Sequence, residues 1–301
     1  MELAEVPLPK FGSGEVLVKI IAAGLNPVDW KIRLGLLKGR MPHQFPIIPG
    51  WEASGIVEAV GSEVIGFRKG DEVFAYTRKE KIQDGTYAEF IALEPRHLAL
   101  KPKNLRFEEA AAIPLAGLTA YQSLFESLKI KKGETILIHA GAGGVGGYAI
   151  QLAKNSRVKV ITTASSRNHQ YVQQLGADKA IDYTKKDFVQ AVLQDFPQGI
   201  DAVFDTVGGE FQKKSAGVLK KGGRLTSILE IDQDYFSQRG ITPGYVFVRP
   251  EPDHLNQLRE LAEAGKLTVH LHKLFSLDQV REAHREIETG HVRGKIILSL
   301  V

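Results

Sequence analysis

A glycine-rich turn near the middle of the chain constrains the fold more than any other segment. Residues 139–147 read HAGAGGVGG and contain the spacing G-x-G-x-x-G. The apolar run Thr135–His139 leads into the turn, and a helical pattern over Val145–Lys154 follows it. Such a turn can serve close helix–strand packing alone, but between a strand and a helix it is typical of a phosphate site at a helix N-terminus. We therefore predict a dinucleotide site. The residues of the turn expected to bind it are Ala142, Gly143, Gly144 and Val145.

The spacing of apolar residues divides the chain into two parts. Residues 1 to about 105 carry short strand patterns such as Glu15–Ala22, separated by Gly and Pro, with one short helix expected at Asn26. Beyond this point, apolar strands such as Val158–Thr163 and Ala202–Thr206 alternate with helical patterns. Buried strands linked by helices are typical of a parallel sheet covered on both faces. We expect a compact antiparallel β part followed by a doubly wound α/β part.

The composition excludes several classes of protein. The chain has no cysteine, which removes disulfides, thiol catalysis, Cys-ligated zinc and iron–sulfur clusters. Its 39 Lys and Arg residues exceed its 35 Asp and Glu residues by four, and no basic stripe indicates a nucleic-acid partner. The longest nearly apolar run, Ala110–Leu118, is too short to cross a bilayer, and no export signal opens the chain. We expect a cytoplasmic protein with no metal, membrane or nucleic-acid partner.

The end of the strand after the turn indicates which dinucleotide is bound. An NAD site usually carries an acid about 20 residues beyond the glycine motif, where it binds the ribose 2′-hydroxyl. Residues 160–168 instead offer hydroxyl groups and an arginine, with no acid. Ser165 and Arg167 suit a 2′-phosphate, although Ser165 also fits a helix cap and Arg167 a solvated position. The pattern favours NADP(H) over NAD(H).

Nine segments, taken in order, carry a family resemblance. They are Gly14–Lys19, Leu25–Arg33, Pro49–Val57, Gly66–Asp71, Gly85–Glu89, Pro114–Tyr121, His139–Gly146, Leu175–Asp178 and Gly294–Lys295. Together they resemble motifs of the zinc-free, quinone-oxidoreductase-like (zeta-crystallin-like) branch of the medium-chain dehydrogenase/reductase superfamily. The segment Glu5–Pro9 follows Met1 closely, whereas relatives normally carry about one more strand and turn before it, so we expect the N-terminal strand of this sequence to be short or missing.

The resemblance implies an α/β protein with two domains. One is a GroES-like, mostly-β catalytic domain over residues 1–112 and 266–301. The other is a Rossmann domain, a doubly wound parallel sheet that binds NADP(H), over residues 113–265. A homodimer is a further family expectation, formed through the edge strands at Arg224–Leu229 or Tyr245–Val248.

The resemblance also implies a reaction, which is hydride transfer from NADPH to a quinone or an α,β-unsaturated carbonyl. Zinc alcohol dehydrogenases of the superfamily have Gly-His-Glu where this chain has Gly50-Trp51-Glu52, so zinc catalysis is not expected. Asn26, Asp29 and Trp30 are expected beside the nicotinamide as positioning residues. Trp30 stands where many relatives show Tyr, and no residue is assigned as the catalytic acid or base.

Further cofactor contacts carry over from the family's motifs. They are Thr119, Tyr183, Thr206, Val207, Gly208, Leu229, Phe247, Val248, Arg293 and Lys295. Two other functions stay open at this point. One is an enoyl-thioester reductase, and the other is a non-catalytic, NADPH-binding or RNA-binding protein of the zeta-crystallin type.

Overall fold

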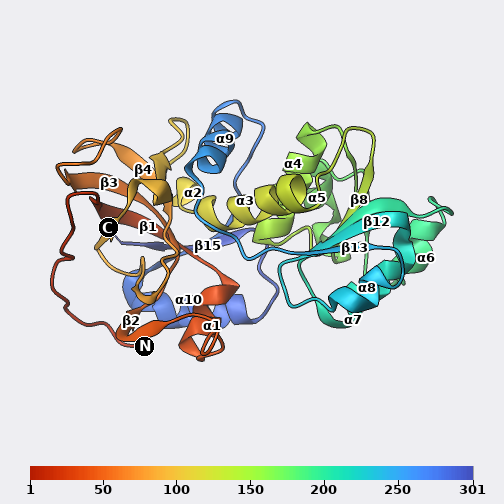
Figure 1. Cartoon of the computed structure of the whole chain (residues 1–301), viewed down its shortest axis with the longest axis horizontal. Coiled ribbons are helices and arrows are strands. Elements are labelled where there is room, and N and C mark those ends of the chain that lie inside the picture. Colours follow the sequence, from red (N-terminus) through yellow and green to blue (C-terminus); the bar gives the residue numbers. More distant parts are fainter. Residues whose placement is uncertain (301) are drawn as a thin grey trace. The chain divides into compact units, whose positions relative to one another are not determined.

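The computed structural model describes residues 1–300, and its contacts divide the chain into two compact units (Figure 1). Unit 1 comprises Met1–Leu118 together with the C-terminal residues from Arg249 onward. Unit 2 comprises Thr119–Val248. The domain boundaries implied by the family resemblance stay a prediction.

Unit 1 is built around a seven-stranded, mostly antiparallel sheet. Its strands are β1 (Val16–Leu25), β3 (Glu52–Val60), β4 (Glu72–Tyr76), β6 (Phe90–Leu93), β7 (Leu98–Leu100), β14 (Leu271–Ser276) and β15 (Lys295–Ser299). They are ordered β14-β15-β1-β3-β4-β7, with β6 beside β1. β1 pairs antiparallel with β3, β6 and β15, whereas β14 and β15 pair in parallel. A small second sheet joins β2 (His43–Ile48) and β5 (Ile82–Asp84). The antiparallel β part is therefore confirmed.

The helices of unit 1 are short, and one of them begins at the end of the central strand. They are α1 (Pro27–Arg33), α2 (Phe107–Ala110), α9 (Pro252–Glu263), α10 (Val280–Glu288) and α3 (Pro114–Tyr121), which crosses the unit boundary in sequence. Asn26 is the N-cap of α1, and Pro27 supplies a backbone angle suited to the first helical position. The Oδ2 atom of Asp29 accepts a hydrogen bond from the Asn26 N–H at 2.7 Å. This turn fixes both side chains next to the end of β1.

Unit 2 contains a six-stranded parallel sheet. Its strands are β8 (Thr135–Ile138), β9 (Lys159–Thr163), β10 (Lys179–Ile181), β11 (Ile200–Asp205), β12 (Leu219–Ser227) and β13 (Thr242–Tyr245). Their order is β10-β9-β8-β11-β12-β13, and every pairing is parallel. The chain winds outward in one direction from β8 to β10 and in the other from β11 to β13. The sheet is therefore doubly wound, and its topological switch point lies between β8 and β11.

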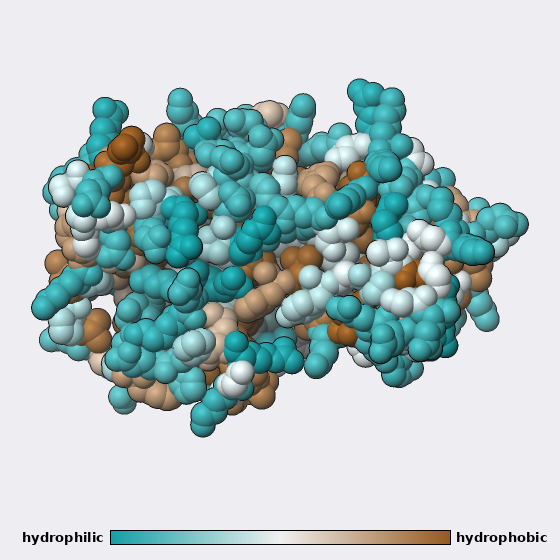
Figure 2. Space-filling model, in the orientation of Figure 1, coloured by the Kyte–Doolittle hydropathy of each residue, from teal (hydrophilic) through white to brown (hydrophobic). Residues whose placement is uncertain are grey.

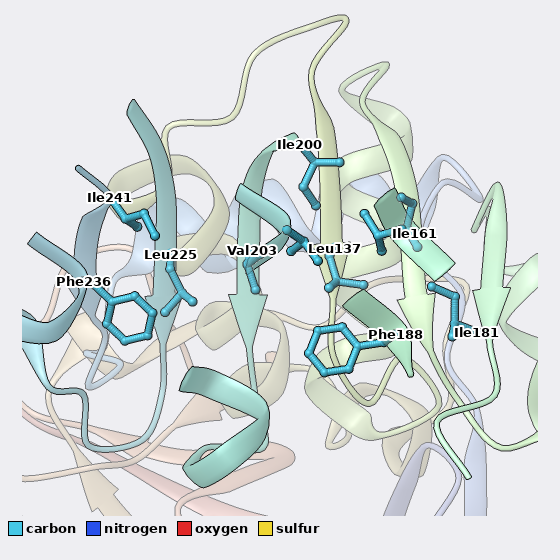
Figure 3. Close-up of a cluster of buried hydrophobic side chains, with 11 residues drawn as sticks. Leu137, Ile161, Ile181, Phe188, Ile200, Val203, Leu225, Phe236 and Ile241 are labelled. Atoms are coloured by element: carbon cyan, nitrogen blue, oxygen red, sulfur yellow. The ribbon is translucent and has the colours of Figure 1, made fainter. Parts of the chain in front are cut away.

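The helices of unit 2 complete the alternation of strands and helices. They are α4 (Gly144–Asn155), α5 (His169–Gln174), α6 (Phe188–Leu193), α7 (Gly209–Lys214) and α8 (Gln233–Ser237). Figure 3 shows Leu137, Val203 and Leu225 from neighbouring strands in one buried cluster, which also contains Phe188 of α6. Because the strand side chains are fully buried, their burial supplies much of the driving force that holds the strand ends in register.

The surface is mostly hydrophilic in the view of Figure 2, with scattered apolar residues. The most exposed large apolar side chains are Ile65 and Phe45. Among residues 1–300, no helix has the length and apolar character that a bilayer crossing requires.

Candidate functional site

The glycine turn links β8 to α4 at the switch point of the unit 2 sheet. A Cβ atom on Gly141 would collide with the Thr162 side chain, and one on Gly146 would collide with the Ala140 carbonyl. These two glycines are therefore required by close packing. Gly143 differs, because its φ of −76° suits any residue and the nearest atom to an added Cβ lies 3.4 Å away. Neither backbone strain nor packing demands glycine there.

Open space at Gly143 is the feature that a bound phosphate needs. Gly143 is the N-cap of α4, so the unpaired N–H groups of the first helical turn begin at Gly144 and Val145. A helix N-terminus attracts anions through these N–H groups and the helix dipole. The residues present therefore fit the pyrophosphate of a dinucleotide.

A buried histidine fixes the strand ends around this turn. The Nε2 atom of His139 lies 2.8 Å from Ser215 Oγ, and its Nδ1 atom lies 3.2 Å from Thr163 Oγ1. Ser215 donates its own proton to the Phe211 carbonyl, so the imidazole N–H is assigned to Nε2. Burial lowers the pKa of His139 to about 4, which keeps the ring neutral. The Thr206 hydroxyl also donates to the His139 carbonyl at 2.9 Å. One side chain and its backbone thus connect β8, β9 and the end of β11.

Asp205 shapes the loop after β11. Its Oδ1 atom accepts hydrogen bonds from the N–H groups of Val207 and Gly208 at 3.0 and 2.9 Å. Its Oδ2 atom accepts from Ser227 Oγ at 2.7 Å, and the Leu229 N–H donates to the same hydroxyl at 3.0 Å. The predicted residues Thr206–Gly208 and Leu229 are therefore brought together around one buried carboxylate. Sequence reasoning missed Asp205, although an acid at the end of a buried strand was a visible signal.

The residues predicted for a 2′-phosphate lie after β9 and β10. Ser165 is the N-cap of a short 3₁₀ helix over Ser166–Asn168, and Asn168 Nδ2 donates to its hydroxyl at 3.3 Å. Arg167 is exposed, and the described residues offer it no ion-pair partner. Tyr183, 42% exposed, directly follows Asp182. The structure shows Ser165 as the cap and Arg167 as an exposed cation in one turn, and 2′-phosphate binding by these residues stays a prediction.

Asp182 and Lys185 extend this group and were not predicted. Asp182 accepts hydrogen bonds from the backbone and hydroxyl of both Ser166 and Thr184, with the Ser166 hydroxyl the closest. These donors, first the Ser166 hydroxyl, hold the pKa of the Asp182 carboxyl well below its usual range. Lys185 Nζ lies 3.2 Å from Ser166 Oγ. Because the acid comes from the next strand in the sheet, the segment after β9 could not reveal it.

A second polar cluster, in unit 1, joins residues that are far apart in sequence. Glu52 Oε1 accepts from Asn26 Nδ2 at 2.7 Å and from Lys295 Nζ at 2.6 Å, while Oε2 accepts from the Leu115 N–H at 2.7 Å. Lys295 Nζ also donates to Asn26 Oδ1 at 2.5 Å and to the Leu25 carbonyl at 3.0 Å. Every donor of the ammonium group is therefore used inside unit 1.

Asp29 completes this cluster together with Tyr87. Its Oδ2 atom accepts from the Tyr87 hydroxyl at 3.0 Å as well as from the Asn26 N–H, while its buried Oδ1 atom has no hydrogen-bond partner among the described residues. Burial raises the pKa of Asp29 to about 7, against the lowering effect of its hydrogen bonds. We call Asn26, Asp29, Glu52, Tyr87 and Lys295 the carboxyl cluster. Neither Glu52 nor Tyr87 was predicted.

The remaining predicted residues have varied surroundings. Trp30 is partly exposed, with Lys31 Nζ 5.7 Å from its ring centroid. In unit 2, Thr119 and Val248 are buried and Phe247 is exposed. Arg293 Nε lies 3.0 Å from His270 Nε2 in unit 1. A phosphate contact by Lys295 stays a prediction, and it would require the ammonium to give up a partner in the carboxyl cluster.

The donor set of this chain does not fit a catalytic zinc ion. Trp51 has no metal-binding atom, both oxygens of Glu52 are occupied, and the chain contains no cysteine. Within residues 1–300, no group of three His, Cys, Asp or Glu side chains has the arrangement of a metal site.

Comparisons with known proteins agree with this architecture. Residues 12–103 match the family described as the alcohol dehydrogenase GroES-like domain, and residues 175–298 match the family described as zinc-binding dehydrogenase. The chain is 39% identical over 305 residues to a 2-methylene-furan-3-one reductase of Solanum lycopersicum, covering 98% of this chain and 74% of the relative. It is 37% identical over 304 residues to a chloroplastic NADPH-dependent alkenal/one oxidoreductase of Arabidopsis thaliana, with the same coverage of 98% and 74%.

A solved structure extends the comparison to three dimensions. The quinone oxidoreductase from Coxiella burnetii superposes with a TM-score of 0.90 at 35% identity. The match covers 100% of this chain and 95% of that one.

Proposed function

Because the chain belongs to the zinc-free, quinone-oxidoreductase-like branch of the medium-chain dehydrogenase/reductase superfamily, we propose that it is an NADPH-dependent reductase of quinones or α,β-unsaturated carbonyls. The proposal rests on the glycine at position 143, at the N-terminus of α4. Neither packing nor backbone strain requires a glycine at this position. The open space beside Gly143 can accommodate a bound phosphate group. The names of the relatives, which include an NADPH-dependent alkenal/one oxidoreductase, support the same reaction class.

Two groups of unit 2 residues hold the cofactor in this proposal. The N–H groups of Gly144 and Val145 bind the pyrophosphate at the start of α4. Ser165, Arg167 and Lys185 bind the 2′-phosphate, since two cations and a hydroxyl suit a dianion. When bound, NADPH supplies a hydride from its nicotinamide ring.

Unit 1 supplies the residues for the acceptor. Negative charge develops on the acceptor oxygen as the hydride arrives, so hydrogen-bond donors that meet this oxygen lower the barrier. We assign that region to the segment Asn26–Trp30, whose Asn26 and Asp29 side chains are held by the other members of the carboxyl cluster, Glu52, Tyr87 and Lys295. A metal has no role in this scheme.

A homodimer is part of the proposal. β13 is an edge strand of the unit 2 sheet, and Tyr245 and Phe247 are exposed at and just after it. An exposed edge strand offers unpaired N–H and C=O groups to a second sheet. Light scattering at micromolar concentration should give a dimer, whereas a monomer would remove this assignment.

The function is tested by following NADPH absorbance with a panel of acceptors. The panel contains a 1,4-quinone, an ortho-quinone, a 2-alkenal, an enone and, with NADP⁺, a simple alcohol, each repeated with the NAD form. Reduction of a quinone or enone with NADPH preferred is the expected result. NADPH binding without turnover of any acceptor would favour a binding protein, and alcohol oxidation would contradict the metal-free reaction.

A further inference from the structure

The carboxyl cluster holds two carboxyl groups but a single ammonium group. Lys295 directs its three N–H bonds to Glu52, Asn26 and the Leu25 carbonyl. Asp29 therefore makes no hydrogen bond to a cation. Burying a second carboxylate without a paired charge is costly, and a carboxyl group in that position gains by keeping its proton.

The two oxygens of Asp29 differ in a way that locates this proton. Oδ2 accepts hydrogen bonds from the Asn26 N–H and the Tyr87 hydroxyl. Oδ1 is buried and has no partner among the described residues. In an ionised group, Oδ1 would be a buried charged atom without a donor, whereas in a carboxylic acid it carries the O–H. The proton then has no acceptor among the described residues of the resting protein, and because Asp29 is fully buried, its donation requires the residues that cover Oδ1 to move when the acceptor binds.

The groups around Asp29 supply no compensating charge beyond the Lys295 ammonium. The titratable and charged groups facing it are Glu52 of β3, Tyr76 of β4, Tyr87 in the segment before β6, and Lys295 of β15, with His284 of α10 stacked edge-on against Tyr87. Burial raises the pKa values of both tyrosines, so they stay neutral. Burial likewise lowers the pKa of His284 to about 4, so this ring is uncharged at neutral pH.

We propose that Asp29 carries a proton on Oδ1 in the resting protein and donates it to the acceptor oxygen during reduction. The inference rests on the proposed function. An enone gains a hydride, with its two electrons, at the β-carbon from the reduced nicotinamide, and its oxygen becomes an enolate. The Oδ1–H bond breaks as the new O–H bond forms, which gives an enol that converts to the saturated ketone. Asp29 is left as a carboxylate and regains its proton from solvent.

Trp30, the next residue of α1, does not supply the proton. The indole N–H of Trp30 is not an acid that can yield a proton at neutral pH, whereas a phenol in this position could. Asp29 precedes Trp30 by one residue in α1 and holds a group with a pKa of about 7, close to the value that suits proton donation at neutral pH.

The protonation state is measured directly on the wild-type protein. With ¹³C-labelled aspartate, the Asp29 Cγ resonance is assigned by its loss in Asp29→Asn or by its displacement in Tyr87→Phe. We expect the resonance of a protonated carboxyl at pH 6 and a titration midpoint near neutrality. Tyr87→Phe removes a donor to Oδ2 and should move the midpoint upward. A carboxylate resonance throughout pH 5 to 8 would overturn the proposal.

The donor role is measured with two acceptors that differ in their need for a proton. The enolate formed from a simple enone must be protonated, whereas a quinone with electron-withdrawing groups gives a hydroquinone anion that is stable in water. Asp29→Asn should lower kcat for the enone about 10²- to 10⁴-fold, the usual contribution of a general acid, and should lower kcat for the quinone at least tenfold less than that. Asp234→Asn, an exposed carboxyl in unit 2, is the matched control.

Each outcome separates the inference from the proposed function. An equal loss with both acceptors would mean that Asp29 only supports the structure, so the inference would fail while the function stood. Lack of wild-type turnover with either acceptor would overturn both. If Asp29→Asn does not fold, the wild-type pH profiles decide. The enone rate should fall above about pH 7 while the quinone rate does not, and parallel profiles would refute the acid role.

Discussion

The Nζ atom of Lys295 lies 2.6 Å from Oε1 of Glu52, and the two side chains are 5% and 0% exposed. A buried ion pair stabilises little compared with a well-packed apolar pair, but removing one partner leaves a buried charge unpaired. The partners are 243 positions apart in the sequence, so the pair joins β3 to the C-terminal strand β15.

Lys295→Met should lower the free energy of unfolding by about 3–5 kcal/mol, because the buried Glu52 carboxylate loses its ion-pair partner. Urea unfolding followed by fluorescence gives the value. Lys69→Met, which breaks the exposed pair of Lys69 with Glu58, should cost less than about 1 kcal/mol. In the double variant Lys295→Met/Glu52→Gln, we expect part of the loss to be recovered. Strict additivity of the two single substitutions would show that the residues do not act as a pair.

Asp29→Asn should change how stability depends on pH. The folded pKa of Asp29, about 7, lies above the unfolded value near 4. Between these values only the native state keeps the proton, so the stability from Asp29 is complete below about pH 4 and is lost as pH rises toward 7. The difference of about three units between the folded and unfolded pKa values corresponds to a loss in the free energy of unfolding on the order of 4 kcal/mol. The difference in unfolding free energy between wild type and Asp29→Asn should therefore decline from pH 5 to pH 8. A flat difference would refute the raised pKa.

The contribution of His139 to stability should depend on pH in the opposite direction, increasing as the pH rises. Its folded pKa of about 4 lies below the unfolded value near 6.5, so the unfolded state binds the extra proton between them. Its contribution is complete above about pH 6.5 and is lost as pH falls toward 4. Ser215→Ala leaves the buried His139 N–H without an acceptor and should cost about 1–3 kcal/mol. Ser156→Ala, at a partly exposed serine that bonds only its own helix, should cost less, and equal losses would contradict the His139 assignment.

Gly146→Ala and Gly143→Ala should separate packing from binding. The first places a Cβ against the Ala140 carbonyl and should destabilise the protein, whereas the second meets no atom closer than 3.4 Å and should leave stability nearly unchanged. Gly143→Ala should nevertheless weaken NADPH binding, because the new methyl group enters the space assigned to the phosphate. Thermal unfolding and fluorescence titration with NADPH measure the two effects. Unchanged NADPH affinity in Gly143→Ala would remove the pyrophosphate site from this turn.

The main features of the fold follow from patterns within a short stretch of chain. The glycine turn, the strand β1 and the helix start at Asn26 were predicted because local spacing determines which face is buried and where a helix begins. The contacts between residues of the candidate sites that are far apart in sequence were harder to predict. Nothing in the sequence indicates that Glu52 meets Lys295, or that Asp182 reaches Ser166, since these contacts depend on which strands become neighbours.

Arg167→Glu should reverse the preference between the two nicotinamide cofactors. A carboxylate in this exposed position would repel the 2′-phosphate of NADPH and have little effect on NADH, which lacks that phosphate. We expect Kd for NADPH to rise at least about tenfold, which corresponds to about 1.4 kcal/mol, with Kd for NADH changed far less. Lys185→Glu should likewise raise Kd for NADPH more than Kd for NADH. An equal loss for both cofactors would contradict the 2′-phosphate assignment.

A deuterium label at C4 of the cofactor shows directly whether NADPH transfers a hydride to the acceptor. The protein is incubated with an enone and NADPH that carries deuterium at C4, on each face of the ring in turn, and the product is analysed by NMR and mass spectrometry. We expect one deuterium at the β-carbon of the saturated ketone from only one of the two labelled cofactors, together with a solvent proton at the α-carbon. A product without deuterium from either cofactor would contradict direct hydride transfer, and with it the assignment of this chain as an NADPH-dependent reductase.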